Sequence, residues 1–415
     1  MKKNNVFHLH YATSMYFNEG GRHYWFAQNL INQGYEPTIF CSNVRHNADD
    51  VISISEGKYR TENNNNIPFV FVETPEYKGN GLKRIFNMVA FYRNLFPVSK
   101  EYAKLKGNPD VILASSVHPL TLVAGIKIAK KFGIPCICEV RDLWPESLVA
   151  YGLLKRNSII AKLLYKGEKW IYKNADSIIM TWEGGRQYIQ NQGWDDQIDL
   201  NKVKHISNGV IIDSFDKNSQ ENQIIDLDLA DNSYKNIVYA GSIRKVNNLG
   251  LLLDSAKIIQ KNDDVKIRFI IYGSGDEKEM LEKRCIDEGI NNVIFKGRVE
   301  KKMIPSILKS AYANILHNSS TSLDKYGQSQ NKFFEYLASG RCVIQTYTTG
   351  FSILEKYKCG ISASQQTPGD IAKIILGICT GEKKAEQMGQ NAREAAYDFD
   401  FKNLTRRLID VIENI

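Results

Sequence analysis

The stretch IVYAGSIRKVNNLGLLL (237–253) decides the fold of the second half of the chain. A short apolar run typical of a buried strand leads into a turn at Gly241 and Ser242, then Arg244 and Lys245, then a segment with helical spacing. Backbone N–H groups at such a turn, together with two cations, suit a diphosphate. The same residues also describe a tight turn with solvated cations, so this stretch alone leaves both interpretations open.

Strands and helices alternate on both sides of this stretch. Apolar strands separated by helices of ten or more residues predict a largely parallel sheet covered on both faces. The asparagine-rich segment 62–66 is expected to be a surface loop. We expect strands at 6–12, 37–42, 67–74, 110–116, 135–140 and 176–182 in the first half, and at 236–242, 267–275, 292–298, 313–318 and 342–347 in the second.

The alternation pauses near HISNGV (205–210), and the polar stretch 217–235 has the composition of exposed connecting material. We therefore predict an α/β protein with two doubly wound, Rossmann-like domains. The N-terminal domain should span 1–213, with a C-terminal helix of about 398–415 packing back on it, and the second domain should span 214–397. Ligands of such folds bind at the carboxyl ends of the strands, so an interdomain cleft is expected to hold the active site.

Composition agrees with a two-domain globular protein. The chain has 415 residues, which is too long for one compact core, and 43% of them are hydrophobic. No apolar run is long enough to span a membrane, and the N-terminus leads straight into a strand-like segment instead of a signal peptide. The seven scattered cysteines include no C-x-x-C pair, which predicts neither a disulfide framework nor a zinc site. A cytoplasmic protein is expected.

The segment YGQSQNKFFEYLASGRCVIQTY (326–347) carries the most specific pattern. It places Asn331 and Lys332 at the polar start of a helix, where phosphate binds, and Glu335 one turn later. A carboxylate there accepts hydrogen bonds from a vicinal diol, as acidic residues do for ribose. The alternative is that Glu335 only favours the helix dipole and Lys332 is solvated, and the segment in isolation favours that alternative.

These motifs together resemble the donor domain of family 4 glycosyltransferases, which are retaining enzymes with the GT-B fold. The resemblance also includes EGGRHYWFAQNLINQGYEPTIF (19–40), EVRDLWPESL (139–148) and HISNGV in the first half. YGQSQNKFFEYLASG looks like the signature of a bacterial subgroup that builds O-antigen and capsule repeat units, often with acetamido or deoxy-amino sugars. The second-half segments are AGSIRK (240–245), YGSGDEKEML (272–281), NVIFKGRV (292–299) and NKFFEYLASGRCVI (331–344).

The resemblance implies roles for particular residues. Arg244 and Lys245 would neutralise the leaving diphosphate, Glu335 would bind the ribose hydroxyls, and main-chain groups near 296–299 would hold the base. Glycines at 20 and 21 would let the backbone approach the diphosphate closely. The predicted donor-binding set is Gly20, Gly21, Gly241, Ser242, Gly273, Gly275, Arg298, Val299, Asn331, Lys332 and Glu335, and the predicted catalytic set is His118, Asp142, Arg244 and Lys245.

One position departs from the family pattern. The family's first glutamate, eight positions before Glu335, falls on Gly327. Either Asp324 or backbone amides of the loop 326–331 would then have to hold the donor sugar. This departure puts the identity of the donor sugar in question.

In the first half, His118 and Asp142 follow predicted strands at their carboxyl ends, where a parallel sheet places its ligands. A neutral imidazole at position 118 would take a proton from the attacking hydroxyl or orient it. A histidine that only caps the turn before Pro119 is the alternative from sequence alone, and the resemblance favours the functional interpretation. Asp142 is the second candidate for orienting the acceptor.

Two segments, 78–106 and 153–173, combine lysine and arginine with large apolar residues. Such segments bind anionic lipid surfaces, and each nearby cation contributes about 1 kcal/mol. Ordinary solvated helices that pack their apolar side on the domain are the alternative. We expect association with the inner face of the plasma membrane and no nucleic-acid partner, because no DNA or RNA motif accompanies the basic residues.

The predicted function is therefore transfer of a sugar from a UDP-sugar to a lipid-linked or saccharide acceptor, such as a polyprenyl-diphosphate-linked saccharide, in surface polysaccharide synthesis. The resemblance implies retention of configuration and no required metal or other cofactor, and neither half contains an obvious D-x-D motif. A non-catalytic sugar-nucleotide binding protein and a nucleotide-sugar epimerase of the same fold are the alternatives. Observed transfer would exclude the first.

Overall fold

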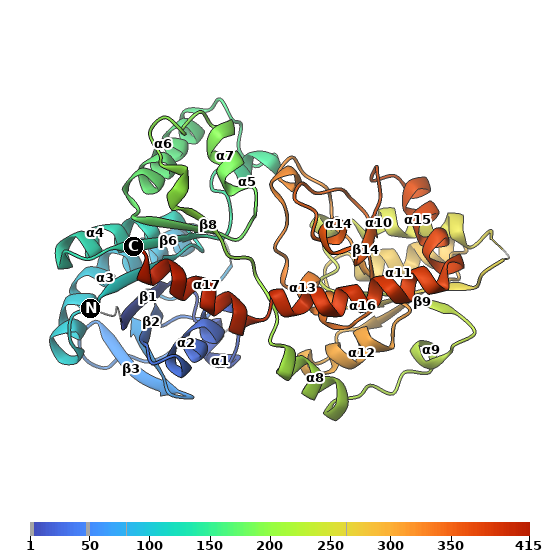
Figure 1. The fold of residues 1–415 in the computed structure, drawn as a ribbon, viewed down its shortest axis with the longest axis horizontal. Coiled ribbons are helices and arrows are strands. Elements are labelled where there is room, and N and C mark those ends of the chain that lie inside the picture. Colours follow the sequence, from blue (N-terminus) through green and yellow to red (C-terminus); the bar gives the residue numbers. More distant parts are fainter. Residues whose placement is uncertain (1–3, 47–49, 80, 263) are drawn as a thin grey trace. The chain divides into compact units, whose positions relative to one another are not determined.

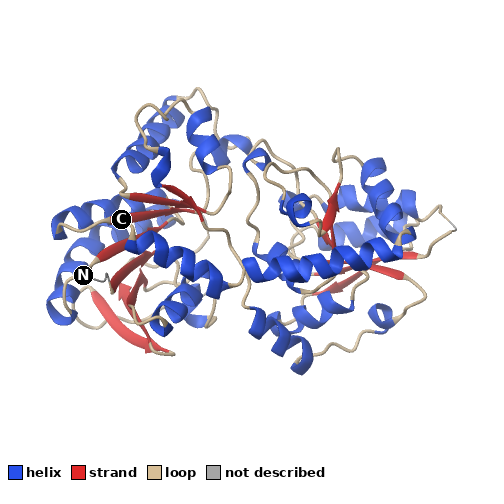
Figure 2. Ribbon diagram, in the orientation of Figure 1, coloured by secondary structure: helices blue, strands red, loops and turns tan. Residues whose placement is uncertain are grey.

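Figure 1 shows the computed structural model of the chain, which describes residues 4–46, 50–79, 81–262 and 264–415. The chain divides into two compact units. Unit 1 comprises Met1–Ser207 together with Leu404–Ile415, and unit 2 comprises Asn208–Asn403. Each unit has its own sheet, with helices packed around it (Figure 2).

Unit 1 is built on an eight-stranded sheet with the order β3-β4-β2-β1-β5-β6-β7-β8. Neighbouring strands are parallel except β3 and β4, which confirms the predicted largely parallel sheet. The strands are β1 (Asn5–His10), β2 (Glu36–Ser42), β3 (Tyr59–Asn64), β4 (Ile67–Val72), β5 (Val111–Ser115), β6 (Cys136–Val140), β7 (Ser177–Met180) and β8 (Val203–His205).

Strands β5 and β6 are buried at every position, because helices cover both faces of the sheet there. Helix α4 packs on β5 and β6, and α2 packs on β2 and β4. The helices are α1 (Ser14–Phe17), α2 (Arg22–Asn32), α3 (Leu82–Lys106), α4 (Pro119–Phe132), α5 (Glu146–Ala150), α6 (Ile159–Asn174) and α7 (Gly185–Asn191).

The asparagine-rich segment 62–66 is not the loop that we predicted. Its first three residues belong to β3, which pairs antiparallel with β4, and only Asn65 and Asn66 form the turn. These two residues have φ of 48° and 66°, a left-handed conformation that asparagine tolerates better than other non-glycine residues. The prediction was wrong because β3 is a polar, largely exposed edge strand whose composition matches that of a loop.

Unit 2 has a six-stranded, fully parallel sheet with the order β11-β10-β9-β12-β13-β14. Alternate residues of β9 enter different cores: Ile237 and Tyr239 pack in one cluster, Val238 and Ala240 in another. This period of two shows that both faces are covered. The strands are β9 (Lys235–Ala240), β10 (Ile267–Tyr272), β11 (Val293–Gly297), β12 (Ala313–Leu316), β13 (Cys342–Gln345) and β14 (Gly360–Ser362).

The helices of unit 2 follow its strands, so each strand ends in a turn that leads to a helix or a short 3₁₀ segment. Three of these 3₁₀ segments are η2 (Lys245–Asn247), η3 (Lys301–Met303) and η4 (Asp324–Tyr326). The helices are α8 (Ile212–Glu221), α9 (Leu227–Ala230), α10 (Leu249–Ile259), α11 (Lys278–Asp287), α12 (Ile304–Ser310), α13 (Asn331–Ala338), α14 (Ile353–Tyr357), α15 (Pro368–Thr380) and α16 (Glu382–Asp398).

The last helix, α17 (Phe401–Glu413), follows a short crossover after α16. In unit 2 the Asp400 carboxylate accepts a hydrogen bond from the Ile212 N–H at 3.0 Å. From Leu404 onward the helix belongs to unit 1, where the Tyr35 hydroxyl donates to Glu413 at 2.7 Å. Among the described residues, no helix combines the length and apolar character needed to cross a membrane.

Candidate functional site

The turn after β9 carries two exposed cations. Arg244 and Lys245 are exposed, and in the described part of the chain neither side chain has a hydrogen-bond or ion-pair partner. The turn does not lead directly into a long helix, because η2 comes first and Asn248, with φ of 51°, redirects the chain into α10. Gly241 lies beside the Tyr239 ring: a side-chain Cβ at this glycine would come within 2.9 Å of the Tyr239 hydroxyl.

Gly273 and Gly275, in the turn after β10, allow the neighbouring turn to approach. A Cβ at Gly273 would lie 1.8 Å from the Gly241 carbonyl oxygen, and one at Gly275 would lie 1.9 Å from the Ile243 carbonyl oxygen. The Ile243 N–H donates to the Ser274 carbonyl at 2.9 Å and joins the two turns. In this structure the two glycines therefore serve close packing of backbone on backbone and fix the shape of the turn at Gly241.

Helix α13 brings a third cation to the same place. The Lys332 ammonium lies 4.7 Å from the centre of the Tyr239 ring, which also contacts the Gly241 turn. Its hydrogen-bond acceptor among the described residues is the His317 carbonyl, at 3.3 Å. Desolvation lowers the pKa of Lys332 to about 8, so most of its population is charged at pH 7. A half-buried, desolvated cation with one neutral acceptor among the described residues is suited to an anionic ligand.

Glu335 follows Lys332 on the same helix, and Asn331 is exposed at the helix start. The Lys301 ammonium of η3 donates to the Glu335 carboxylate in an ion pair. Lys301 is largely exposed, with 74% of its side chain accessible, so a ligand hydroxyl can replace it at small cost. Near the end of β11, Arg298 is exposed and Val299 is half-buried.

The structure gives a reason for the glycine at position 327. Gly327 follows η4 with φ of 99°, a conformation that side chains rarely adopt, so a glutamate would strain this backbone. Asp324, the predicted substitute, uses one carboxylate oxygen within its own loop. That oxygen accepts hydrogen bonds from the Thr321 N–H at 2.7 Å and the Ser320 hydroxyl at 2.8 Å.

A network of amide side chains supports the loop after Gly327, and sequence reasoning missed it. The Gln328 side-chain amide donates to the side-chain oxygen Oε1 of Gln345 at 2.6 Å, and the Tyr347 hydroxyl donates to Oε1 of Gln328 at 3.1 Å. Gln330 in turn donates to the Tyr347 hydroxyl at 2.8 Å. The spacing of these glutamines along the sequence does not predict that they meet. The fold brings Gln345 of β13 beside the loop that carries Gln328 and Gln330. The network fixes the backbone that leads to Asn331 and Lys332.

In unit 1, Gly21 immediately precedes α2 and has a φ of 115°, a conformation that explains the need for glycine there, whereas Gly20 has an ordinary φ. The next residue, Arg22, is buried and forms an ion pair with Glu139 at the end of β6, with 2.7 Å between nitrogen and oxygen. Burial alone would raise the pKa of the Glu139 carboxyl, but the charge and hydrogen bond of Arg22 lower it below its usual value.

Three buried histidines to which we had assigned no role, His8, His10 and His23, lie around Glu139. His23 Nε2 lies 3.5 Å from the Glu139 carboxylate, and the His23 ring contacts the rings of His8 and His10 at 4.6 and 3.9 Å. Desolvation lowers the pKa of all three, to about 4 in His8. His8 and His10 are two positions apart in β1, so the sequence pattern could have predicted that both lie on one face of that strand.

His118 precedes α4 and is almost fully buried, with its ring centre 4.7 Å from that of Tyr11. Neither ring nitrogen has a hydrogen-bond partner within the described residues. Desolvation, assisted by the charge of Arg84, lowers its pKa to about 3, so the ring is neutral. Asp142, after β6, is exposed, although nearby protein atoms raise the pKa of its carboxyl by desolvation.

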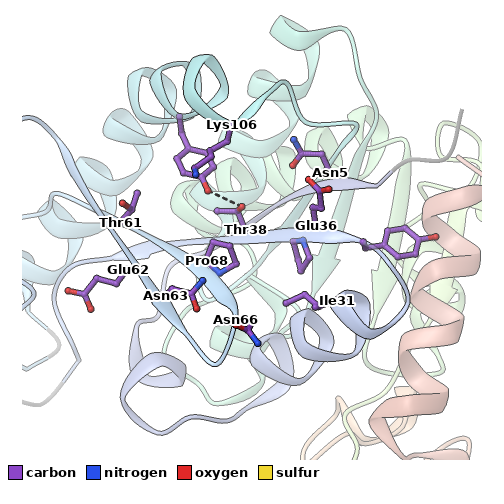
Figure 3. Close-up of a pocket in the computed structure, with 13 residues that line it drawn as sticks. Asn5, Ile31, Glu36, Thr38, Thr61, Glu62, Asn63, Asn66, Pro68 and Lys106 are labelled. Carbon is purple, nitrogen blue, oxygen red and sulfur yellow. Dashed lines mark hydrogen bonds between the residues drawn. The ribbon is translucent and has the colours of Figure 1, made fainter.

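A polar cavity of about 580 Å³ lies elsewhere in unit 1 (Figure 3). It includes the first residues of β1 and β2, Asn5 and Glu36, so it lies at the amino ends of these strands and contains none of the predicted site residues. The Thr38 and Tyr102 hydroxyls share a hydrogen bond of 3.3 Å inside it. Within the described residues, no group of three or more histidine, cysteine or acidic side chains is arranged to hold a metal ion.

Comparison with known proteins relates both units to transferases. Residues 24–214 match the family model described as Glycosyltransferase Family 4, and residues 219–395 match Glycosyl transferases group 1. The uncharacterized glycosyltransferase MJ1178 of Methanocaldococcus jannaschii is 20% identical over 80% of this chain and 82% of its own length. The putative colanic acid biosynthesis glycosyl transferase WcaI of Escherichia coli K12 is 24% identical over 72% of each protein. The structure of Anabaena Alr3699/HepE in complex with UDP has a TM-score of 0.66 at 14% identity, with 100% of both chains covered.

Proposed function

Since the chain is a family 4-like glycosyltransferase with the GT-B fold, we propose that it transfers a sugar from a UDP-sugar donor to a lipid-linked or saccharide acceptor, with retention of configuration. The proposed setting is the synthesis of a surface polysaccharide such as O-antigen or capsule, and the name of WcaI supports this class of product. The resemblance of YGQSQNKFFEYLASG to amino-sugar transferases supports an acetamido or deoxy-amino sugar as the transferred group.

The observation that carries the donor assignment is the set of three cations at one turn of unit 2. Arg244 and Lys245 extend from the turn that Gly241 begins, and Lys332 lies against the Tyr239 ring that contacts the same turn. Cations so placed would stabilise the charge that develops on the departing diphosphate. Glu335, one helical turn beyond Lys332, would accept hydrogen bonds from the ribose hydroxyls after displacing Lys301.

In unit 1, His118 and Asp142 are the proposed contacts of the acceptor hydroxyl. Both ring nitrogens of His118 lack partners in the described part of the chain, so the ring has a free acceptor and a free donor. With a pKa of about 3 the imidazole is a weak base, and we assign it the orienting role in place of proton removal. The acceptor oxygen would bond to the anomeric carbon as the bond to the diphosphate breaks, and the proton of the acceptor hydroxyl would pass to the departing diphosphate. No protein nucleophile is required.

Association with an anionic membrane is part of the proposal. Helix α3 exposes Leu82 and Phe86 by 73% and 67%, and α6 exposes Ile159 and Leu163 by 86% and 68%. These apolar side chains therefore do not all pack on the domain, which was the alternative interpretation of both segments. Lysines of the same helices would attract acidic headgroups.

The donor proposal is tested first by binding and then by turnover. Purified protein is screened against UDP-sugars for a rise in melting temperature, because a ligand bound by the native state alone raises it. Transfer is then measured with the best donor. Glu335→Ala and Arg244→Ala are expected to abolish transfer with the fold intact, and His118→Ala to lower it strongly.

The matched controls are Glu394→Ala and Lys261→Ala, which remove charges from exposed positions of α16 and of the turn after α10. These variants should transfer at the wild-type rate. Near-normal turnover in all three site variants would overturn the assignment of the site. Donor hydrolysis or transfer by the wild-type protein would exclude a purely binding role.

A further inference from the structure

Unit 1 contains a small apolar cavity, separate from the polar cavity of Figure 3. Its volume is about 180 Å³, and it lies between α4 and α6 at the carboxyl ends of β5 and β6. The walls are mainly aliphatic and aromatic, including Leu122, Val123, Trp144 and Ile171. Asp142, a proposed contact of the acceptor, also lines it. The cavity is therefore next to the place where the acceptor hydroxyl would be held.

The one buried carboxyl that lines this cavity is neutralised by its surroundings. Glu168 is hydrogen-bonded to the hydroxyls of Tyr172 at 2.7 Å and Tyr188 at 2.8 Å. Desolvation raises the pKa of Glu168 to about 8, so the group is mainly uncharged at pH 7. With its polar atoms paired and its charge absent, this wall suits a hydrocarbon better than a sugar or a phosphate.

The cavity opens on the apolar face of α6. Gly167 and Leu163 both line it and both are exposed, and Ile159 lies one further turn back on the same face at 86% exposure. Lys162 and Lys166 are exposed on the adjacent face of the helix. A path of apolar surface beside two cations thus leads along α6 to the cavity, and it matches a ligand with a hydrocarbon tail and an anionic head.

We propose that this cavity binds the isoprenoid unit next to the diphosphate of a polyprenyl-diphosphate-linked acceptor, while the lysines of α6 attract the diphosphate. The proposal rests on the proposed function, in that the acceptor is taken to be lipid-linked. The size is suitable: an apolar protein cavity of about 150 Å³ binds benzene, so about 180 Å³ accommodates a five-carbon unit. Such a contact would select lipid-linked acceptors and place their first sugar near Asp142.

Gly167 allows a direct test. A Cβ at Gly167 meets no atom within 4 Å, so this position has room for a side chain to begin, and Gly167→Leu is expected to narrow the mouth of the cavity. Leucine also has a higher helix propensity than glycine, which should preserve the fold. Gly377→Leu is the matched control, because Gly377 is likewise an exposed helical glycine with nothing within 4 Å, but in α15 of unit 2.

Binding of geranyl diphosphate and of inorganic diphosphate is measured by calorimetry for the three proteins at saturating UDP, with intrinsic tryptophan fluorescence as a second readout. The wild type and Gly377→Leu should bind geranyl diphosphate at least about tenfold more tightly than inorganic diphosphate, and Gly167→Leu should lose most of this preference. Equal affinity of the wild type for the two ligands, or an unchanged preference in Gly167→Leu, would overturn the proposal.

UDP affinity, measured on the same preparations, reports on the donor site independently. Loss of UDP binding in the wild type would contradict the proposed function, whereas normal UDP binding without a preference for geranyl diphosphate would contradict only the cavity assignment. A free N-acetyl sugar, which lacks the hydrocarbon, is tested in the same way as geranyl diphosphate. If the tighter binding is lost with this sugar, the hydrocarbon is supported as the occupant of the cavity. Tight competition by that sugar would instead assign the cavity to the saccharide.

Discussion

Lys332 is a half-buried ammonium whose charge would be compensated mainly by the bound ligand. Its pKa of about 8 lies well below the ordinary 10.5, because burial disfavours its charged form. Between about pH 8 and 10.5 the unfolded chain binds more protons than the native protein. Lys332 therefore makes the free energy of unfolding rise with pH in that window. A bound diphosphate would act in the opposite direction and restore the proton.

We predict that UDP binding at pH 8 takes up roughly half a proton, and that UDP affinity falls above this pH. Calorimetry in two buffers with different ionisation enthalpies measures the uptake. Lys332→Met should remove both effects, whereas Lys245→Met, which deletes an exposed cation of the same site, should weaken binding and retain the proton uptake. Identical heats in the two buffers for the wild type would contradict the assignment of Lys332 to the diphosphate.

At position 327 the backbone conformation favours glycine over any other residue. Its φ of 99° predicts that Gly327→Glu does not restore a family-like carboxylate but destabilises unit 2, by about 1–3 kcal/mol. Urea unfolding followed by circular dichroism measures the change. Gly377→Ala, in the middle of α15, should instead stabilise by about 0.5–1 kcal/mol. A stable Gly327→Glu protein with higher donor affinity would show that the loop tolerates the acid.

At the scale of elements, α6 combines three features on one helix. The Ser158 hydroxyl caps its start by accepting from the Ala161 N–H at 3.2 Å, and Ile171 and Tyr172 are buried in unit 1. The exposed residues near its start are apolar and basic, as in helices that lie in a membrane interface. The helix is thus fixed to the unit at one end and offers an amphipathic surface at the other.

We predict that replacing Lys162 and Lys166 by glutamine weakens binding to phosphatidylglycerol vesicles by roughly thirtyfold, since each lysine contributes about 1 kcal/mol near an anionic surface. Sedimentation with vesicles measures the partition. The control changes Lys383 and Lys384, two exposed lysines of α16, to glutamine and should bind as the wild type does. Equal binding of the two double variants would refute a specific role for α6, and binding of both to duplex DNA would indicate nonspecific attraction.

At the scale of the whole molecule, the two units should respond differently to acid. Unit 1 buries His8, His10, His23 and His118, all with lowered pKa values, whereas the buried histidine described in unit 2 is His317. Below about pH 6.5 these histidines take up protons in the unfolded chain, whereas in native unit 1 desolvation keeps them neutral to lower pH, to about pH 4 in the case of His8. The contribution of these neutral histidines to the free energy of unfolding of unit 1 is therefore complete above pH 6.5 and is lost as the pH falls below 6.5.

We expect unit 1 to lose more stability than unit 2 between pH 6.5 and 5, at up to about 1.4 kcal/mol per histidine and pH unit. Hydrogen exchange of β1 and β9 amides, measured in parallel at several pH values, separates the two units. His8→Phe should reduce the pH dependence of β1 and leave that of β9 unchanged. Parallel losses in β1 and β9 for the wild type would show that the histidine cluster does not control acid stability.

Local pattern explains what could be predicted from sequence. Consecutive residues encode hydrophobic period, turn composition and helix starts, so the strands around 237–253, the parallel sheets and the start of α13 at Asn331 were within reach. The β3 strand was missed because an exposed edge strand and a polar loop have the same composition. The chemical class of the protein followed from the resemblance of these ordered motifs to those of family 4 glycosyltransferases, because each motif in isolation left a purely structural interpretation open.

The sequence by itself therefore determined the α/β architecture, the glycosyltransferase class and the residues nearest the turn at Gly241. Only the tertiary structure decided which distant groups meet: Arg22 with Glu139, 117 positions apart, and Lys332 with Tyr239. It also decided that Gly273 and Gly275 serve contact between turns, and that an apolar cavity lies beside Asp142. The physical reason is that burial, desolvation and close backbone approach depend on which faces the fold brings together, and no spacing along the chain records them.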